Sequence, residues 1–375
     1  MNSYENFIVD IKKFDIKRLP GVSGVLRLKN DEEFLESCIN SCIHCVDELV
    51  VVYEETSDKS LQILQKLEKQ YPEKIKVYHY QPKLYVGELN ESEYKSAIKE
   101  PSDSVHLLAN YCNFAFSKIQ YRYALKIDTD QVYIETKLKR ICDAYRAEPK
   151  FGKFNPLDLL SFLVVLFFIF ISQKLKLMPS FFLSEGVFNR YFSFLILLIQ
   201  WKKVPVSLSG INLVIEEKEV LIPLGKNNCN GTNILPPFNG VGDTPLFKLT
   251  SQTYFVPWES ENYSKRTGKK HLIIERLENV HSLLPVGVCW AHFSAMRKNI
   301  KELQKQNIRS FPNHFLSLNK ESFSKNKLFR YEKNWETYER LCFRFLPSSI
   351  NEDVLVWLKG FELIDGYIKR KEPKQ

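Results

Sequence analysis

The sequence lacks the features that mark several common classes of protein. It has no internal repeat and no low-complexity tract, and residues 1–20 are polar and charged, unlike a secretory signal peptide. It has no zinc-finger spacing and no RNA-binding signature, so we do not expect nucleic acid as a partner. The eight cysteines are scattered along the chain. We therefore expect reduced thiols in a cytoplasmic protein.

The bulk composition is that of an ordinary globular protein. The 375 residues are 26% charged and 44% hydrophobic, so the chain can form one large domain or two modest ones. The formal net charge of +9 favours acidic partners, such as phosphate-bearing substrates or an anionic membrane surface.

The first part of the chain alternates between two kinds of periodicity. Short apolar runs at 21–30, 49–53 and 75–80 predict strands, and helical spacing predicts helices over about 31–45, 59–70 and 105–119. Residues 83–104 are polar and are predicted as a loop. This alternation is typical of an α/β protein with a mostly parallel sheet. Ligands of such sheets bind at the carboxyl ends of the strands, where this sequence places acidic residues.

The most informative of these strand ends is Tyr123–Tyr133. An apolar strand stops at Asp128 and Asp130, and a turn there would bring both carboxylates to one point. Two close carboxylates repel unless a cation lies between them, and Mg²⁺ or Mn²⁺ shared with substrate phosphates is a common solution. The alternative is ordinary polar turn chemistry.

Three segments carry a resemblance to a known family. In order, Gly24–Glu32, Tyr53–Ser60 and Leu125–Asp130 resemble the signatures of GT-A glycosyltransferases. More narrowly, they resemble bacterial lipopolysaccharide transferases of the β-1,4-N-acetylgalactosaminyltransferase type, which are similar to the family 2 glycosyltransferases. The resemblance covers roughly residues 20–145 and, more faintly, 205–300. It implies a GT-A (Rossmann-like) fold and transfer of a sugar from a UDP-sugar with inversion.

The resemblance also implies roles for individual residues. It assigns Asp128 and Asp130 to the metal ion that holds the donor diphosphate. The residues expected to bind the nucleotide sugar are Asn30, Asp31, Glu55 and Asp58, with Arg27 and Lys126 added as basic groups. A positive side chain such as Arg27 can meet a donor phosphate, although the alternative is a polar position on a strand.

Two residues of the later sequence are candidates for the chemistry itself. His292 is a candidate third metal ligand, because imidazole suits Mn²⁺; the alternative is a half-buried histidine bonded to the backbone. Asp243 lies in a predicted glycine-flanked loop and is the candidate base that deprotonates the acceptor hydroxyl. The alternative for Asp243 is an ordinary turn aspartate.

Two apolar stretches interrupt the α/β pattern, at 157–172 and 191–201. Both are shorter than the roughly 20 residues of a spanning helix, and lysines flank each of them. We expect a hairpin that dips into the cytoplasmic face of the inner membrane. The alternatives are a surface buried against another subunit and a genuine two-helix span.

The cysteines Cys38, Cys42 and Cys45 have the spacing of a radical-SAM iron–sulfur motif. Their spacing is also that of a buried helix stripe, which we favour.

Together these observations predict four segments: a nucleotide-sugar half at 1–145, a hydrophobic helical insert at 146–203, an acceptor half at 204–300 and a basic helical region at 301–375. The predicted function is metal-dependent transfer of a hexose or N-acetylhexosamine to a lipopolysaccharide, another glycolipid or an oligosaccharide. The alternatives are a nucleotidyltransferase, which would show a glycine-rich phosphate loop after its first strand, and a non-catalytic scaffold at the membrane.

Overall fold

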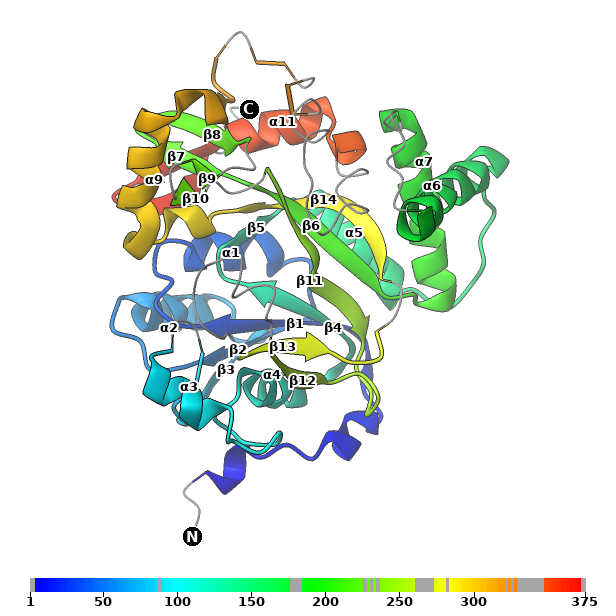
Figure 1. The fold of residues 1–375 in the computed structure, drawn as a ribbon. Helices are drawn as coiled ribbons and strands as arrows, with labels where there is room; N and C mark the ends of the chain where they lie inside the picture. Colours follow the sequence, from blue (N-terminus) through cyan, green and yellow to red (C-terminus); the bar gives the residue numbers. More distant parts are fainter. Residues whose placement is uncertain are drawn as a thin grey trace. The chain divides into compact units, whose positions relative to one another are not determined.

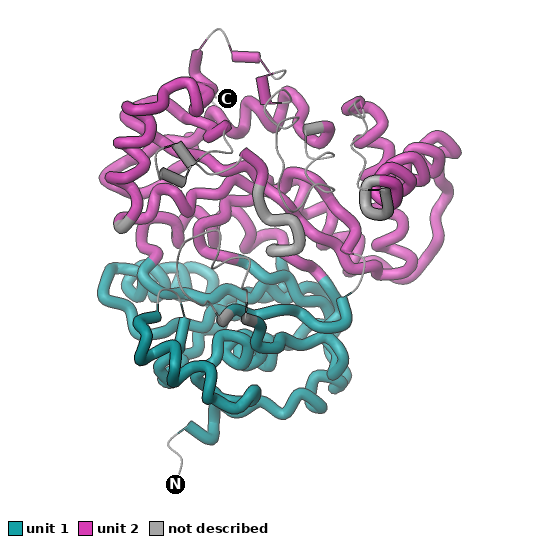
Figure 2. The backbone as a smooth tube through the Cα atoms, viewed as in Figure 1, with its two compact units in different colours: residues 1–30, 46–127, 247–282 teal, residues 31–45, 128–246, 283–375 magenta. Residues whose placement is uncertain are grey.

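The chain folds into two compact units that interleave along the sequence. The computed structural model describes residues 4–86, 89–175, 184–224, 228–229, 232–233, 237–259, 273–280, 283–320, 323–324, 327–328 and 347–371. Unit 1 comprises Met1–Asn30, Val46–Ile127 and Phe247–Ser282, and unit 2 comprises Asp31–Cys45, Asp128–Leu246 and Leu283–Gln375 (Figure 2). The four predicted segments stay a prediction.

Unit 1 is built on parallel strands, as the alternating sequence pattern predicts. Its strands are β1 (Leu19–Leu28), β2 (Glu48–Tyr53), β3 (Ile75–His79) and β4 (Tyr121–Asp128), in the order β3-β2-β1-β4. β1 is parallel to β2, and β2 is parallel to β3. The amide of Leu19 donates to the carbonyl of Gln120 at 3.2 Å, so β1 and β4 start at the same edge. The carboxyl ends of these four strands therefore share the opposite edge.

Helices cover the strands of unit 1 (Figure 1). They are α2 (Ser60–Gln70), α3 (Glu91–Ala97) and α4 (Leu108–Ser117), with the short 3-10 helices η1 (Glu5–Phe7) and η2 (Ile11–Asp15). α4 packs against β1 and β2, and the antiparallel pair β12 (Phe255–Glu259) and β13 (Ile273–Leu277) packs against α4. The apolar run Leu49–Val52 is fully buried, as expected for an inner parallel strand.

Unit 2 contains a mixed set of strands. β5 (Gln131–Tyr133), β6 (Val206–Asn212), β11 (Phe238–Lys248) and β14 (Leu284–His292) lie in the order β11-β6-β14-β5. β14 is parallel to β6 and antiparallel to β5, and β11 is antiparallel to β6. A second sheet has the order β15-β8-β7, from Phe315–Ser317, Glu219–Pro223 and Val214–Glu216. The predicted α/β class with a mostly parallel sheet and flanking helices is confirmed.

Helices and two small hairpins complete unit 2. The helices are α1 (Leu35–Cys42), α5 (Glu135–Arg146), α6 (Pro156–Leu175), α7 (Glu185–Lys202), α9 (Lys298–Ser310) and α11 (Glu352–Lys359), with the 3-10 helices η3 (Ser294–Met296), η4 (Pro312–His314) and η5 (Pro347–Ser349). The hairpins are β9 (Asn228–Cys229) with β10 (Thr232–Asn233), and β16 (Phe361–Ile364) with β17 (Tyr367–Arg370).

Three local predictions are wrong. Residues 83–104, predicted as a loop, contain α3, whose first turn is closed by a capping box between Asn90 and Glu93. Asp243, predicted in a loop, lies on the backbone of β11, in a stretch where the register with β6 shifts between Asn239 and Thr244. The predicted helical C-terminal region includes α9 and α11, but Phe361–Ile364 pairs as a strand instead of extending α11.

The hydrophobic insert forms the pair α6 and α7. Phe162 of α6 stacks on Tyr191 of α7 at 5.3 Å between ring centroids and contacts Phe194 at 5.1 Å. Within the described residues, no helix is both long and apolar enough to cross a membrane.

The three cysteines of the iron–sulfur pattern are buried and donate to three different carbonyl groups. Cys38 donates to Asp128, Cys42 to Ile39 and Cys45 to Glu135, each at 3.5 Å. Cys38 and Cys42 lie on the buried face of α1, as the spacing predicts, whereas Cys45 lies in the turn after the helix, which ends earlier than predicted.

Candidate functional site

The turn between β4 and β5 holds the two aspartates in unit 2. Asp128 is the last residue of β4, Thr129 and Asp130 make the turn, and Gln131 opens β5. The turn is fixed from outside, because the amide of Phe293 donates to the carbonyl of Asp130 at 2.9 Å. The predicted turn after the strand is therefore present, and it presents the Asp130 carboxylate to the end of β14.

Asp130 and His292 face each other across adjacent strands. In the antiparallel pair of β5 and β14, His292 is the register partner of Gln131, the residue after Asp130. His292 Nε2 lies 3.4 Å from Asp130 Oδ1, and both side chains are largely buried. The structure thus brings together two of the three predicted metal ligands, which are 162 positions apart in the sequence.

Asn212 sets the orientation of the His292 ring. It ends β6 opposite His292 in the parallel pair with β14, and its Oδ1 lies 2.7 Å from His292 Nδ1. An amide oxygen can only accept, so Nδ1 carries the proton and donates it. In the neutral ring, Nε2 then presents its lone pair to the Asp130 carboxylate, an arrangement that is favourable only with a cation or an added proton between them.

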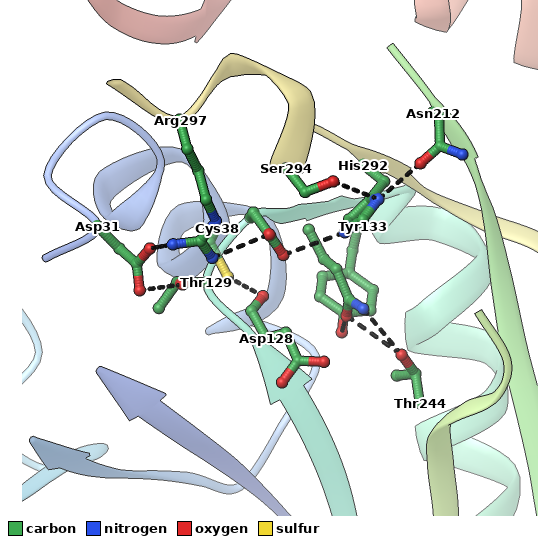
Figure 3. A network of polar contacts seen from close by, with 12 residues as sticks. Asp31, Cys38, Asp128, Thr129, Tyr133, Asn212, Thr244, His292, Ser294 and Arg297 are labelled. Atoms are coloured by element: carbon green, nitrogen blue, oxygen red, sulfur yellow. Dashed lines mark hydrogen bonds and ion pairs between the residues drawn. The ribbon is translucent and has the colours of Figure 1, made fainter. Parts of the chain in front are cut away.

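Arg297 bridges Asp130 and Asp31 (Figure 3). One of its terminal nitrogens lies 3.0 Å from Asp130 Oδ2, and the other pairs with Asp31 Oδ1. Thr129 donates to the second oxygen of Asp31 at 2.6 Å. The buried carboxylates of Asp31 and Asp130 therefore share the guanidinium of Arg297. Arg297 lies in the chain between η3 and α9.

The two carboxylates differ in their electrostatics although they share Arg297. Burial raises the pKa of Asp31 to about 6, outweighing the opposing effects of Arg297 and the Thr129 hydrogen bond. Burial also acts on Asp130, but in the metal-free protein the positive charges of a protonated His292 and of Arg297 together hold its pKa well below the ordinary value. The pKa of Arg297 is raised, because the two carboxylates outweigh its loss of solvation. Asp130 is thus the firmly ionised member of the site.

Asp128 does not join Asp130. Its backbone carbonyl accepts from Cys38, and Figure 3 shows its carboxylate directed away from His292 and Arg297. The expectation that both acids of the Asp-x-Asp motif converge on one point is not met in this arrangement, because Asp128 still belongs to the strand while Asp130 lies in the turn.

The nucleotide-binding candidates of unit 1 lie at the strand ends. Asn30, which has a positive φ of 52° after β1, accepts a hydrogen bond from the amide of Ser57 at 2.8 Å. The loops that follow β1 and β2 are therefore joined at the carboxyl edge. Asp58 accepts from the amide of Ser60 at 2.9 Å at the start of α2, and Glu55 is exposed to solvent.

The two predicted basic residues, Arg27 and Lys126, lie within the strands β1 and β4 and not in the loops that follow the strands. Arg27 pairs with Glu275 at 3.0 Å and donates to the thiol of Cys112 at 3.1 Å. Lys126 is buried within β4. Asp31, predicted beside Asn30, belongs instead to the Arg297 network of unit 2.

Sequence reasoning missed Asn212, Arg297 and Thr129. Asn212 and His292 become neighbours only through the parallel pairing of β6 with β14, which no local pattern encodes. Asp243 cannot be placed in the site, because its side chain lies outside the described residues. Thr244, the next residue, is buried and bonded to Gln131 at 3.0 Å.

The donor groups fit a divalent ion that completes its coordination with substrate. The 3.4 Å between Asp130 Oδ1 and His292 Nε2 exceeds a charge-assisted hydrogen bond of about 2.8 Å. It is close to the roughly 3 Å between neighbouring ligands of an ion with bonds of about 2.1 Å. The Nδ1 donation to Asn212 is typical of metal-binding histidines. In the described residues, no group of three or more His, Cys, Asp and Glu side chains could hold a metal ion, so Asp130 and His292 would need ligands from bound substrate or water.

Comparison with known proteins gives only distant likenesses. No protein-family model matches the sequence, and no curated protein matches it. Among solved structures, the chain is similar to glucosyl-3-phosphoglycerate synthase from Mycobacterium tuberculosis in complex with Mg²⁺ and UDP, with 16% identity and a TM-score of 0.20. A complex of that enzyme with Mn²⁺, UDP-glucose and phosphoglyceric acid gives 16% identity and a TM-score of 0.19.

These likenesses are partial. They cover 32% of this chain and 37% of the mycobacterial enzyme, so the chain spans little more than a third of the structures that it matches. A likeness of this extent assigns neither an activity nor a ligand to this chain.

Proposed function

We propose that the protein is a glycosyltransferase that uses a UDP-sugar and Mn²⁺ or Mg²⁺. Its donor would supply a hexose or N-acetylhexosamine, and its acceptor would be a lipopolysaccharide, another glycolipid or an oligosaccharide. The proposal joins the resemblance of Gly24–Glu32, Tyr53–Ser60 and Leu125–Asp130 to GT-A enzymes with the geometry around Asp130.

One observation carries the proposal. His292 Nε2 faces the buried, ionised Asp130 carboxylate at 3.4 Å while Asn212 fixes the proton on Nδ1. This pair has the two donor atoms that a divalent ion accepts, and it lacks the further protein ligands of a purely structural site. A diphosphate is the natural partner for the remaining coordination positions, which is why we propose a nucleotide-sugar donor.

The neighbouring residues would hold the site in place. Arg297 keeps Asp130 in position and also forms an ion pair with Asp31. Asn212 holds the orientation of the His292 ring. When bound, the metal ion supplies electrostatic stabilisation of the negative charge that develops on the leaving UDP. Asn30, Glu55 and Asp58 at the strand ends of unit 1 are the proposed uridine and ribose contacts.

Asp243 and α6 belong to the acceptor side of the proposal. Asp243 is the proposed base, which takes the proton of the attacking hydroxyl, and inversion at the anomeric carbon follows from such a single displacement. A membrane-borne acceptor is supported by the exposed apolar residues of α6, namely Leu157, Leu160, Leu163, Phe167 and Phe170. We therefore propose a cytoplasmic enzyme held at the inner membrane by the α6–α7 hairpin.

Metal-dependent hydrolysis of a panel of UDP-sugars tests the proposal without knowledge of the acceptor. We expect release of UDP and free sugar with Mn²⁺ or Mg²⁺ and none with EDTA. Asp130→Asn and His292→Ala should each lower the rate by at least about a hundredfold, in the range that removing a preorganised electrostatic group produces. His44→Ala, at an exposed surface histidine, is the matched control and should retain the rate.

The products separate the proposal from its alternatives. Pyrophosphate released from a nucleoside triphosphate and a sugar phosphate would identify a nucleotidyltransferase. Folded protein that neither turns over nor binds any UDP-sugar would contradict the transferase assignment and favour a scaffold.

A further inference from the structure

A recess lies in unit 2, apart from the network around Asp130. Its volume is about 650 Å³, and it is lined by residues of α5, α7, α11, η5 and the end of β17. It shares no lining residue with the network of Asp31, Asp130 and His292. This volume is in the range of pockets that hold small molecules.

The recess is strongly basic. Four of its lining side chains are cationic, namely Lys137 and Arg140 of α5 and Arg370 and Lys371 at the end of β17, whereas Asp353 is the one acidic lining residue. Lys371 pairs with Glu362 at 3.2 Å. In the described part of the chain, Lys137, Arg140 and Arg370 form no ion pair with a carboxylate.

Lys137 is the innermost of these charges. Its ammonium donates to the carbonyl of Val288 at 2.7 Å and otherwise meets the faces of Phe188 and Phe192, at 5.8 and 5.2 Å from the ring centroids. Arg140 lies over the same Phe192 ring at 5.1 Å. Burial lowers the pKa of Lys137 to about 8. Buried charges in proteins are normally paired, so this arrangement is complementary to an anion.

The apolar part of the lining comes mainly from α7 and α11. Phe188 and Phe192 come from α7, and Trp357 comes from α11. One face of α7 thus lines the recess, while Tyr191 and Phe194 pack against Phe162 of α6. The hairpin that exposes the apolar stripe of α6 also forms one wall of the basic recess.

We propose that this recess binds the phosphate monoester head of a membrane lipid, with Lys137 and Arg140 on the phosphate and the exposed Val356 of α11 beside the start of its apolar chain. A phosphate monoester carries close to two negative charges and matches two converging cations, and the planar guanidinium of Arg140 suits its oxygens. A carboxylate would neutralise only one of them. The site stands independently of the proposed sugar transfer.

Calorimetric titration of the full chain with dodecyl phosphate, below its micelle concentration, tests this site. Inorganic phosphate shows how much the phosphate group alone contributes to binding. Dodecanoate carries a carboxylate in place of the phosphate on a chain of similar length. We expect dodecyl phosphate to bind at least about tenfold more tightly than either. Lys137→Met and Arg140→Gln should each weaken it at least about tenfold.

Lys139→Gln is the matched control. Lys139 is the neighbour of Arg140 in α5, is exposed and pairs with Asp143 at 3.0 Å, so its loss should change the affinity less than about twofold. Arg140→Gln changes an exposed residue and is expected to fold even where Lys137→Met does not.

Three results would overturn the site: no binding of dodecyl phosphate, equal binding of inorganic phosphate, or the same affinity in Lys137→Met, Arg140→Gln and Lys139→Gln. Equal binding of inorganic phosphate would identify a site for free phosphate instead. UDP-sugar hydrolysis, measured on the same variants, should be retained, so failure of the lipid site and failure of the transferase assignment are separate results.

Discussion

At the scale of single residues, Asp31 and Asp130 show how position decides the behaviour of one side-chain type. Both are buried and both contact Arg297, yet only Asp130 also faces His292. The pKa of Asp31 is raised to about 6, whereas that of Asp130 is lowered. Opposite shifts have opposite consequences for the pH dependence of stability.

Asp31→Asn should therefore stabilise the metal-free protein near neutral pH. The folded protein holds the Asp31 proton more tightly than the unfolded chain, so the contribution of Asp31 to the unfolding free energy falls as the pH rises from about 4 to about 6. The difference between a pKa of about 6 and the ordinary 3.8 corresponds to on the order of 3 kcal/mol as an upper value. Urea unfolding in EDTA at about pH 7.5 should show the gain, and at about pH 4 it should vanish.

Asp130→Asn is the contrasting variant. The stabilising contribution of ionised Asp130 is present above its unfolded pKa and is lost as the pH falls through the lower folded value, so this variant should be less stable at neutral pH. If both variants lose stability equally at neutral pH, the ion pair between Asp31 and Arg297 outweighs burial, and the assigned asymmetry is wrong.

The sequence marked Asp130, at a strand end, and His292, by its residue type, as candidates, and the structure places the two side chains next to each other. Their role as metal ligands stays a prediction. The sequence could not supply Arg297 or Asn212. Their roles depend on the pairing of β6, β14 and β5, which brings together residues from three distant parts of the chain. It also overestimated Asp128, since alternation along a strand does not tell at which residue the strand ends.

At the scale of elements, the contact of β6 with β14 supports the site. Gly210 lies in β6 opposite Trp290 in β14, and a Cβ added at Gly210 would overlap the buried indole ring. The close approach of these two strands also places Asn212 beside His292, two residues further along each strand. This glycine therefore has a packing role.

Gly210→Ala should lower the unfolding free energy by about 1–3 kcal/mol or more, the usual cost of overpacking a core. It should also weaken metal binding, because Asn212 and His292 follow the displaced strands. Gly186→Ala is the control: it lies in the first turn of α7 with its nearest neighbour 4.0 Å from the added carbon, and it should be neutral or slightly stabilising. Equal unfolding midpoints for the two variants in urea would contradict the packing role.

The element predictions succeeded where periodicity was strong and failed where context decided. The buried run Leu49–Val52 and the buried positions of Cys38 and Cys42 in α1 needed only local pattern. β11 was missed in part because Gly240–Pro245 has turn composition, yet pairing with β6 keeps it in a strand with an irregular register. Phe361–Ile364 has the composition of a helix but forms the strand β16, because it pairs with β17.

At the scale of the whole molecule, the net charge of +9 and the apolar face of α6 support the proposed membrane partner. Leu160 and Phe167 are 57% and 58% exposed, which is unusual for large apolar side chains that recur on one helix face. Lys150 and Lys153 precede this helix and are exposed. Apolar and basic groups side by side are typical of an interfacial helix on an anionic membrane.

Leu160→Glu combined with Phe167→Glu should abolish flotation of the full chain with vesicles that contain anionic lipid, because two charges would have to enter the acyl region. Ile98→Glu changes an equally exposed apolar residue of unit 1 and should float like the wild type. Flotation that persists in the double variant would show that α6 is not the membrane face.

The most direct test of the central claim is a titration of Mn²⁺ into the protein with UDP present, followed by electron paramagnetic resonance. The account predicts one tightly bound Mn²⁺ per chain, with affinity at least about tenfold lower in His292→Ala and Asp130→Asn than in His44→Ala or the wild type. Mn²⁺ that binds equally well in all four proteins, or that does not bind even with UDP, would contradict it.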